Sequence, residues 1–565
     1  MIPIVIGVTG HRLIRTDAVP KIEQLVREKL IAIRNQFSHS SLYVISPLAE
    51  GADRLVAKMA LDLGMKLIVP LPLREQEYEK DFATQESKAE FNDLLLRAAM
   101  VYRMPVLSID EPFVGENRDA QYAYVGAWVA HYSHILLALW DGVKTNALGG
   151  TAQIVEYKSK GIPFYIKNKD PDEMLLTNSI LDSFETGLVY HLKTPRLGDQ
   201  SIASCEIDWQ TLPSQDKGIN RPVMKDLEKI DSMNREFKRY WDNSSNQLDV
   251  DDIFPKDLPT SSDWFQKLTS LLKVYQFADH QSLQNQSGTV WYSRLFIIVV
   301  IVAVLVFNLY TNWFEIPVTM AIYWVLFILA NGINFFANRH QRWEEKWYDD
   351  RALAEAVRIQ IYWKLFGIRP LVTNFLLRKH VSLSAWIYQS ITALDLINEE
   401  IRRDEIKDNT ILHKVARYWI DGQKNYFMKK QAHAAQTMKR FKVWQKVCFV
   451  LAWVISGMLI FIDWKLHASS YPFWHQMLVI IATVLPVFGG FMALRANTFL
   501  LDYQSEQYDS MAQLYQRASD LLKADVNLED AHYRAMIRDV GKSALQEVGD
   551  WLVAQYERRN EAFKG

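Results

Sequence analysis

Residues 3–12, with the sequence PIVIGVTGHR, decide the fold class of the N-terminal region. The stretch opens with an apolar, β-branched run and ends in glycine, threonine and two basic residues. A short buried strand followed by a glycine-containing loop is typical of the first strand of a parallel sheet. We therefore predict a strand over residues 3–8, followed by a loop that reaches Arg12.

Apolar runs of similar length recur at residues 42–46, 66–70, 100–106, 134–139 and 163–166, with helical patterns between them. Strands that alternate with helices build a parallel sheet covered on both faces. Residues 1–167 are therefore predicted to form a doubly wound α/β domain. In such a sheet the ligand lies beyond the carboxyl ends of the strands.

Three of these strand ends carry loops with residue types that bind phosphates and sugars. Glycines permit close backbone approach, basic side chains face anions, and carboxylates accept ribose hydroxyls. The candidate ligand-binding residues after the first strand are Gly7, Thr9, Gly10, His11 and Arg12. Those after the second strand are Glu50, Gly51, Asp53 and Arg54, and those after the fifth are Asp141, Gly142, Gly149, Gly150 and Thr151.

Each loop also has an ordinary structural interpretation. Gly-Gly-Thr at 149–151 is common in turns, Thr-Gly-His at 9–11 can cap a helix, and Glu50 and Asp53 can be partners of a helix dipole. Three such loops at one edge of one sheet favour a ligand site over coincidence. We expect a nucleotide-like small molecule as ligand, and no metal or further cofactor.

Four apolar stretches lie in the C-terminal half, at residues 295–310, 316–337, 447–462 and 473–494. Each approaches the ~20 residues that cross a hydrocarbon layer of ~30 Å. Four buried helices of a soluble core are the alternative, but aromatic residues at the ends of the stretches favour membrane spans. We predict an all-α membrane portion with four transmembrane helices in two hairpins, extended by long cytosolic helices.

Basic residues gather at the open ends of the hairpins, whereas the loop that closes the first hairpin has none and the loop that closes the second has only Lys465. Around the first hairpin they are Arg294, Arg339, Arg342 and Lys346, and around the second Lys439, Arg440, Lys442, Lys446 and Arg495. By the positive-inside rule, both closing loops are outside and both termini are cytoplasmic. The N-terminus has no features of a secretory signal, so a multi-pass protein of the inner membrane is expected.

The polar segments around the hairpins suggest a duplicated unit. Residues 263–410 and 411–565 are each predicted to form helix, transmembrane hairpin and helix, and residues 168–262 a partly helical excursion or linker. Trp343 and Trp347 stand at i, i+4, as do Glu344 and Tyr348, which favours packing between helices or between subunits. A cytosolic helical bundle is preferred here over a ligand site. No ionisable residue lies in the middle of a span, which disfavours a carrier. A pore would need several subunits, so a homo-oligomer in the lipid bilayer is expected.

Composition excludes several classes of function. The 64 Lys and Arg residues balance 65 Asp and Glu residues, giving a formal net charge of -1. Without a basic field, nucleic acid is not expected as a partner. The two cysteines, Cys205 and Cys448, lie far apart, which favours a reducing compartment over a disulfide framework.

The N-terminal motifs resemble the SLOG superfamily of nucleotide-sensing Rossmann-like domains, which includes LOG and DprA-like domains and the N-terminal region of TRPM channels. The resemblance rests on GVTGHR at 7–12, AEGADRLVA at 49–57, LPL at 71–73 with Tyr78 and Asp81 beyond it, and WDG at 140–142 with GGTA at 149–152. The paired hairpins resemble the SLATT-type membrane effector modules that accompany SLOG domains.

The resemblance implies a nucleotide sensor coupled to a pore-forming or membrane-perturbing effector in a bacterial antiviral defence or stress system. Most of the candidate residues named above stand in the matching motifs and are implied ligand contacts. His11, Arg54 and Gly142 are candidates from their place in the loops.

A structural membrane scaffold that binds no ligand is one alternative, and an enzyme is the other. A membrane-tethered phosphoribohydrolase would cleave a nucleotide N-glycosidic bond, with Glu50 or Asp53 stabilising positive charge on the ribose. LOG-type hydrolases carry the pattern PGGxGTxxE, whereas this chain has ALGGTAQIVE at 147–156. The carboxylates also have no recognisable nucleophile or metal partner, so sensing is favoured over hydrolysis.

Overall fold

The computed structural model describes most of the 565-residue chain. The described residues are 1–107, 114–145, 147–160, 187–199, 206–212, 223–243, 246–313, 316–337, 342–369, 371–375, 385–398, 400–401, 405–406, 409–465, 472–498, 501–524 and 530–564. They form two compact units. The predicted strand at 163–166, Cys205 and Arg339 lie outside the described residues.

The first unit comprises Met1–Leu248, Pro259–Val274 and Ala356–Glu405 and contains a seven-stranded sheet of order β4-β3-β2-β1-β5-β6-β7. Its strands are β1 (Ile4–Gly10), β2 (Leu42–Ile45), β3 (Lys66–Leu71), β4 (Met100–Arg103), β5 (Ile135–Trp140), β6 (Leu188–Lys193) and β7 (Trp209–Leu212). All neighbours are parallel except β6 and β7. The parallel sheet predicted from the alternating pattern is confirmed.

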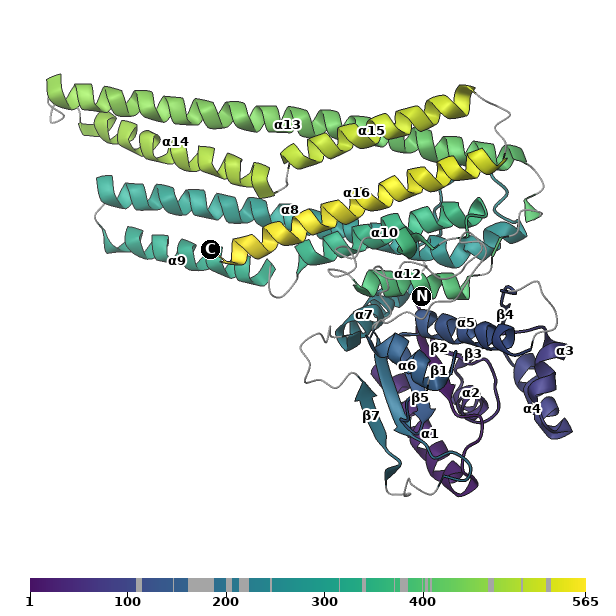
Figure 1. The fold of residues 1–565 in the computed structure, drawn as a ribbon. Helices are drawn as coiled ribbons and strands as arrows, with labels where there is room; N and C mark the ends of the chain where they lie inside the picture. The colour runs from purple at the N-terminus through teal and green to yellow at the C-terminus, as the bar shows by residue number, and fades with distance from the viewer. Residues whose placement is uncertain are drawn as a thin grey trace. The chain divides into compact units, whose positions relative to one another are not determined.

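Helices connect the parallel strands by crossovers (Figure 1). The chain moves from β1 to β4 through α1 (Val19–Gln36), α2 (Ala52–Asp62) and α4 (Gln85–Leu96), with short helices at η1 (Thr16–Ala18), α3 (Glu75–Tyr78) and η2 (Glu79–Asp81). It then returns across the sheet through α5 (Glu116–Tyr132) to β5, and continues through α6 (Thr151–Lys160). Right-handed crossovers place α1, α2 and α4 on one face and α5 and α6 on the other. The order therefore reverses between β1 and β5, which is the switch point of the sheet.

The sheet extends into residues that the sequence analysis placed in an excursion or linker. β6 and β7 belong to this range, as does α7 (Val223–Asp242), whose Asn234 side chain accepts from Ile2 N–H at 2.9 Å. From later in the chain, η6 (Val372–Phe375) and α12 (Ala385–Ile397) also belong to this unit. The α12 carbonyl of Gln389 lies 3.2 Å from His134 Nε2, at the start of β5. Such non-local contacts are invisible to patterns that span only a few residues.

The second unit comprises Asp249–Leu258, Tyr275–Glu355 and Ile406–Gly565 and is helical (Figure 1). The helices that supply it are α8 (Asp263–Asn312), α9 (Pro317–Phe335), α10 (Trp343–Leu365), α13 (Asn409–Lys465), α14 (Pro472–Thr498), α15 (Leu501–Ala524) and α16 (Asp530–Lys564). The first residues of α8 and the last of α10 belong to the sheet-containing unit.

Four of these helices, α8, α9, α13 and α14, are long and apolar enough to cross a membrane. In each, no more than 11% of the most apolar window is buried. Helices of a soluble core would bury most of such a window, so the low burial favours the predicted membrane spans over the buried-core alternative. α8 and α13 each join a polar segment and an apolar segment in one continuous helix.

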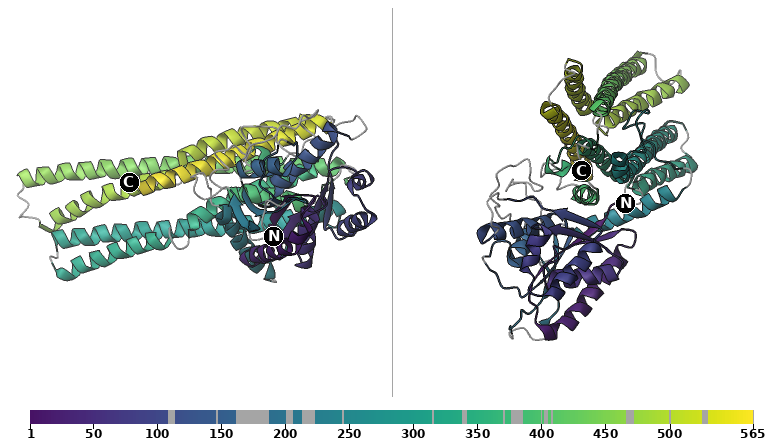
Figure 2. Two further views of the ribbon diagram at one scale, coloured as in Figure 1. Left: turned by 60° about the horizontal axis from the view of Figure 1, so that its bottom comes forward. Right: turned by 90° about the vertical axis from the view of Figure 1, so that its right-hand side faces the viewer.

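The two hairpins contact each other within the second unit (Figure 2). Thr483 of α14 donates its hydroxyl to Asn308 of α8 at 2.8 Å, and Trp313 stacks on Phe473 with ring centroids 5.6 Å apart. In the polar part, Phe427 of α13 stacks on Tyr515 of α15 with centroids 5.6 Å apart. The hairpins therefore form one four-helix arrangement that continues into aromatic-rich polar helices.

Candidate ligand site at the strand ends

Arg12, directly after β1, is the exposed cation of the candidate site. Its guanidinium carbon lies 5.3 Å from the centre of the Tyr122 ring, and Nη2 is 3.9 Å from Asp81 Oδ2. Its side chain is 48% exposed, so the charge can still be reached from solvent. A guanidinium held against an aromatic face is positioned to bind a phosphate or a similar anion.

Asp81 holds the surrounding side chains in place. Arg118 Nη2 donates to Asp81 Oδ1 at 2.7 Å, and the Tyr122 hydroxyl donates to the other carboxylate oxygen. Arg118 also donates to Glu77 at 3.1 Å. Arg118 and Tyr122 both bind Asp81 at short range, whereas Arg12 has only the longer contact to this carboxylate. The Arg12 guanidinium is therefore more available to a ligand than that of Arg118.

Asp53, in the first turn of α2, is the buried carboxylate of this cluster. Its exposed fraction is 7%. Burial raises the pKa of the Asp53 carboxyl from 3.8 to about 7. The charge of Arg12, a hydrogen bond from the Ala49 amide and the charge of Arg54 oppose this rise. Tyr78 is also buried in this region and donates its hydroxyl to the Pro47 carbonyl at 3.1 Å. Near neutral pH, Asp53 therefore exists as a mixture of acid and carboxylate, sensitive to any charge placed beside it.

Replacing Asp53 should change how the stability of the protein depends on pH. Because the folded-state pKa is raised, the contribution of Asp53 to stability is fully present below about pH 3.8 and is lost as pH rises to about 7. The loss has an upper bound of about 4 kcal/mol. Asp53→Asn does not show this loss. The thermal midpoint of the variant minus that of wild type should therefore increase from pH 5 to pH 8. A midpoint difference that stays constant over this range would contradict the assignment.

Glycines bring the loops after β1 and β2 into direct backbone contact. A Cβ on Gly51 would lie 2.2 Å from the Arg12 carbonyl oxygen, and one on Gly10 would lie 2.5 Å from Ala52 Cβ. The Ala52 amide, at the start of α2, donates to the His11 carbonyl at 3.0 Å. The Ala52 amide at the start of α2 is thus already occupied by the loop after β1. Gly7 serves packing instead, since its Cβ would meet Ser133 of the segment after α5 at 2.8 Å.

His11 forms a second cluster at the switch point between β1 and β5. Its Nε2 accepts from the Asp141 amide at 2.9 Å and from Arg196 Nε at 3.2 Å, while Arg196 also contacts Asp141 Oδ2 at 2.8 Å. Burial lowers the pKa of His11, and the nearby charge of Asp141 opposes this shift. His11 thus links the ends of two strands, and its predicted role toward an anionic ligand stays a prediction. Gly142, at φ 84°, continues this turn.

Glu50 and Arg54 point toward α4. Ser87 donates its hydroxyl to Glu50, and Arg54 donates to the Leu48 carbonyl at 3.0 Å and to Glu90 at 3.0 Å. Arg54 is 2% exposed, so these contacts compensate the burial of its charge. Both residues therefore connect the loop after β2 to α4.

The loop after β5 lies against α5. A Cβ on Gly149 would lie 2.7 Å from the Ala123 amide nitrogen, and the Gly149 amide itself donates to the Gln153 side chain at 2.7 Å. Gly150 and Thr151 lead into α6, and Thr9 is half-buried near the end of β1. The loop after β5 is therefore held against the first half of α5.

The structure places Arg12, Gly51 and Asp53 in one region, and their role in ligand binding stays a prediction. Two further residues of this region, Arg118 and Tyr122, were not among the candidates from the sequence. Arg118 and Tyr122 stand at i, i+4 near the start of α5, which begins at the carboxyl edge of the sheet. The polar residues at the start of the helix that follows the fourth strand could have identified Arg118 and Tyr122 as candidates. Within the described ranges, no group of three His, Cys, Asp or Glu residues is placed to hold a metal ion, and Cys448 is a buried free thiol.

Residues 273–366 match a known effector family. Its description is SLATT_3, SMODS and SLOG-associating 2TM effector domain 3. The matched segment covers most of α8, the hairpin it forms with α9, and α10. No curated protein and no solved structure matches the chain. The predicted SLATT-like module is therefore confirmed for the first hairpin, whereas the SLOG resemblance of the sheet remains a prediction.

Proposed function

We propose that the sheet-containing unit binds a nucleotide or nucleotide derivative, and that binding changes the arrangement of the membrane helices. The chain would then act as a sensor and membrane effector in a bacterial defence or stress system. The observation that carries the ligand part is Arg12, which is exposed over Tyr122 at the carboxyl edge of a parallel sheet and interacts electrostatically with the buried Asp53. The effector part is supported by the family match at residues 273–366.

Two helices offer a route for coupling, because each contributes residues to both units. α8 is fixed in the sheet-containing unit by Lys267, which pairs with Glu405 at 2.9 Å. α10 is fixed there by Lys364, which pairs with Asp395 of α12 at 2.9 Å. In the helical unit, the same two helices meet through a hydrogen bond from Asn285 to Asp350 at 3.0 Å. A ligand that favours one arrangement of the first unit can therefore bias the helices that lead into the membrane.

Arg12→Ala should weaken nucleotide binding by tenfold or more, because a charge-assisted hydrogen bond to phosphate is lost. The measurement is isothermal calorimetry of the detergent-solubilised full chain with a panel of nucleotides. Arg27→Ala is the matched control, since Arg27 is 47% exposed and has a similarly long contact to Asp62 at 3.8 Å. Equal affinities in the two variants would remove Arg12 from the site.

The ligand found in this panel should make membranes leaky. Full-length protein in liposomes is expected to release a trapped dye when the nucleotide is added, at a rate that rises more than linearly with protein density if a homo-oligomer conducts. Arg12→Ala should need a higher nucleotide concentration for the same release. If a confirmed ligand leaves permeability unchanged at every density, the chain signals through another partner instead.

Hydrolysis of the ligand is the second candidate function, and Asp53 is the observation that favours it. A buried carboxylate with a pKa of about 7 is suited to general acid or base chemistry. Analysis of the nucleotide after incubation separates the two functions. Release of a free base that is abolished in Asp53→Asn would identify an enzyme, and an unchanged nucleotide would identify a sensor.

A further inference from the structure

A basic cavity lies at the polar end of the second hairpin, far in sequence from the candidate ligand site. Its volume is about 440 Å³, and it is lined by Ala435, Met438, Lys439, Lys442, Val443, Lys446 and Ser505. Ser505 stands near the start of α15 and the other residues lie on α13. The cavity therefore lies between two helices of one unit.

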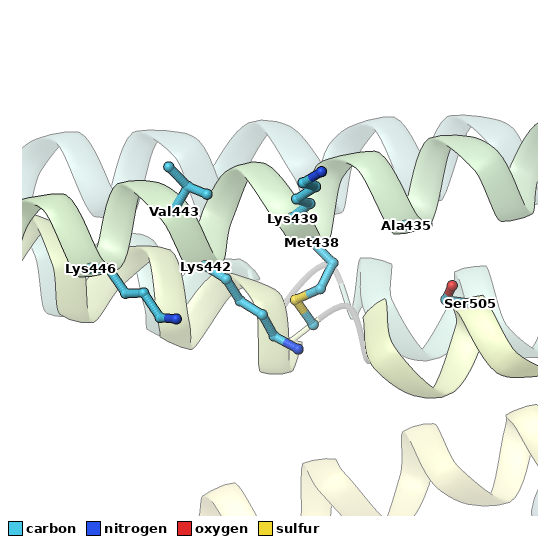
Figure 3. A pocket seen from close by; sticks show the side chains of 7 residues that line it. All are labelled: Ala435, Met438, Lys439, Lys442, Val443, Lys446 and Ser505. Carbon is cyan, nitrogen blue, oxygen red and sulfur yellow. The ribbon is translucent and has the colours of Figure 1, made fainter.

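The lysines share one side of α13. Lys439, Lys442 and Lys446 are spaced at i, i+3 and i+7, which places them along one helix face. Figure 3 shows Lys442 and Lys446 directed to the same side as Met438, with the Ser505 hydroxyl facing α13 from α15. Lys439 also lines the cavity but is directed away from Lys442 and Lys446 in this view. Two convergent ammonium groups and a hydroxyl group suit an anion with several acceptor oxygens, and the first turns of α15 add the positive end of a helix dipole.

The position of the cavity indicates where such an anion comes from. Lys446 is followed directly by the apolar stretch of α13 that begins at Val447, and α14 returns to the same level, ending at Thr498 shortly before α15 begins. Once this hairpin crosses a bilayer, the cavity lies at the depth of the phospholipid headgroups. Lysine ammonium groups at this depth attract anionic lipids.

We propose that this cavity binds the phosphate-bearing headgroup of an anionic phospholipid, which bridges α13 and α15. The lipid would join the membrane-spanning part of α13 to the polar helix α15, with its acyl chains along the apolar stretch. The inference requires that the second hairpin crosses a membrane, but it is independent of nucleotide binding.

The test compares lipid binding by the detergent-solubilised full chain and its variants using native mass spectrometry. The probes are phosphatidylglycerol, phosphatidylcholine with the same acyl chains, and inorganic phosphate at equal concentration. Lys442→Gln and Lys446→Gln each remove one charge from the cavity, and the double variant removes two. Arg440→Gln is the matched control, because Arg440 is exposed on the same stretch of α13 and does not line the cavity.

We expect wild type to bind phosphatidylglycerol in preference to phosphatidylcholine. Each lysine substitution should weaken phosphatidylglycerol binding about fivefold, and the double variant about 25-fold. Arg440→Gln should stay within about twofold of wild type, and Lys442→Arg should retain binding because it keeps the charge. An equal loss in Arg440→Gln would show that only the general surface charge matters, which overturns the proposal. Displacement of the lipid by an equal concentration of inorganic phosphate would identify free phosphate as the ligand and overturn the lipid assignment.

Discussion

Gly51→Ala should destabilise the sheet-containing unit by on the order of 3–5 kcal/mol and abolish ligand binding. The Gly51 backbone has φ 80° and ψ -120°, a conformation that only glycine adopts without strain. A Cβ at this position would also lie 2.2 Å from the Arg12 carbonyl oxygen and 2.4 Å from that of His11. Both atoms belong to backbone anchored to β1, so neither can move aside without displacing the strand end.

Gly64→Ala is the matched control for this prediction. Gly64 has a similar φ of 77°, but a Cβ added there would meet no atom within 4 Å beyond its chain neighbours. Only backbone strain remains, which costs about 1 kcal/mol. Thermal midpoints of the full chain in detergent, together with nucleotide binding, compare the two variants. If both lose the same stability, the close approach of the two loops is not what requires glycine at 51.

Trp551→Ala should release α16 from α10. The Trp551 side chain is 1% exposed, and its ring centroid lies 6.0 Å from that of Trp347 and 5.3 Å from that of Tyr348. Arg351 adds a cation–π contact at 4.4 Å. Removing the indole leaves a cavity that costs about 3–5 kcal/mol, and the loss of the cation–π contact adds to this. Trypsin should therefore cleave within α16 at least 100-fold faster than in wild type, since cleavage follows the population of the open state.

Trp551→Phe is the control for this substitution. Among the described residues, the Trp551 indole N–H has no hydrogen-bond partner, so phenylalanine loses packing area but no hydrogen bond. Its cleavage rate should lie much closer to wild type than that of Trp551→Ala. Equal rates in all three proteins would mean that α16 is held by its other contacts, such as the one from Arg558 to Glu344.

Local patterns were enough to identify the architecture. Short apolar runs between helical patterns predicted β1 to β5 because a strand buried on both faces needs a continuous apolar sequence. The length and charge-free character of four stretches predicted the candidate spans, because the bilayer thickness sets a minimum length. Trp347 was recognised as a packing position from its spacing, and it does pack on Trp551.

The sequence by itself determined the parallel sheet, the four apolar helices, and the loops in which a ligand site would lie. Only the tertiary structure decided the role of each side chain in those loops, because the role depends on partners distant in sequence. His11 meets Asp141 and Arg196 and becomes a neutral link between strands, whereas its neighbour Arg12 meets Tyr122 and stays exposed. Asp53 acquires its raised pKa from burial, which no local pattern measures. The addition of β6 and β7 to the sheet likewise depends on pairing, of β6 with β5 and of β7 with β6. Backbone hydrogen bonds select these partners, and residue periodicity does not reveal them.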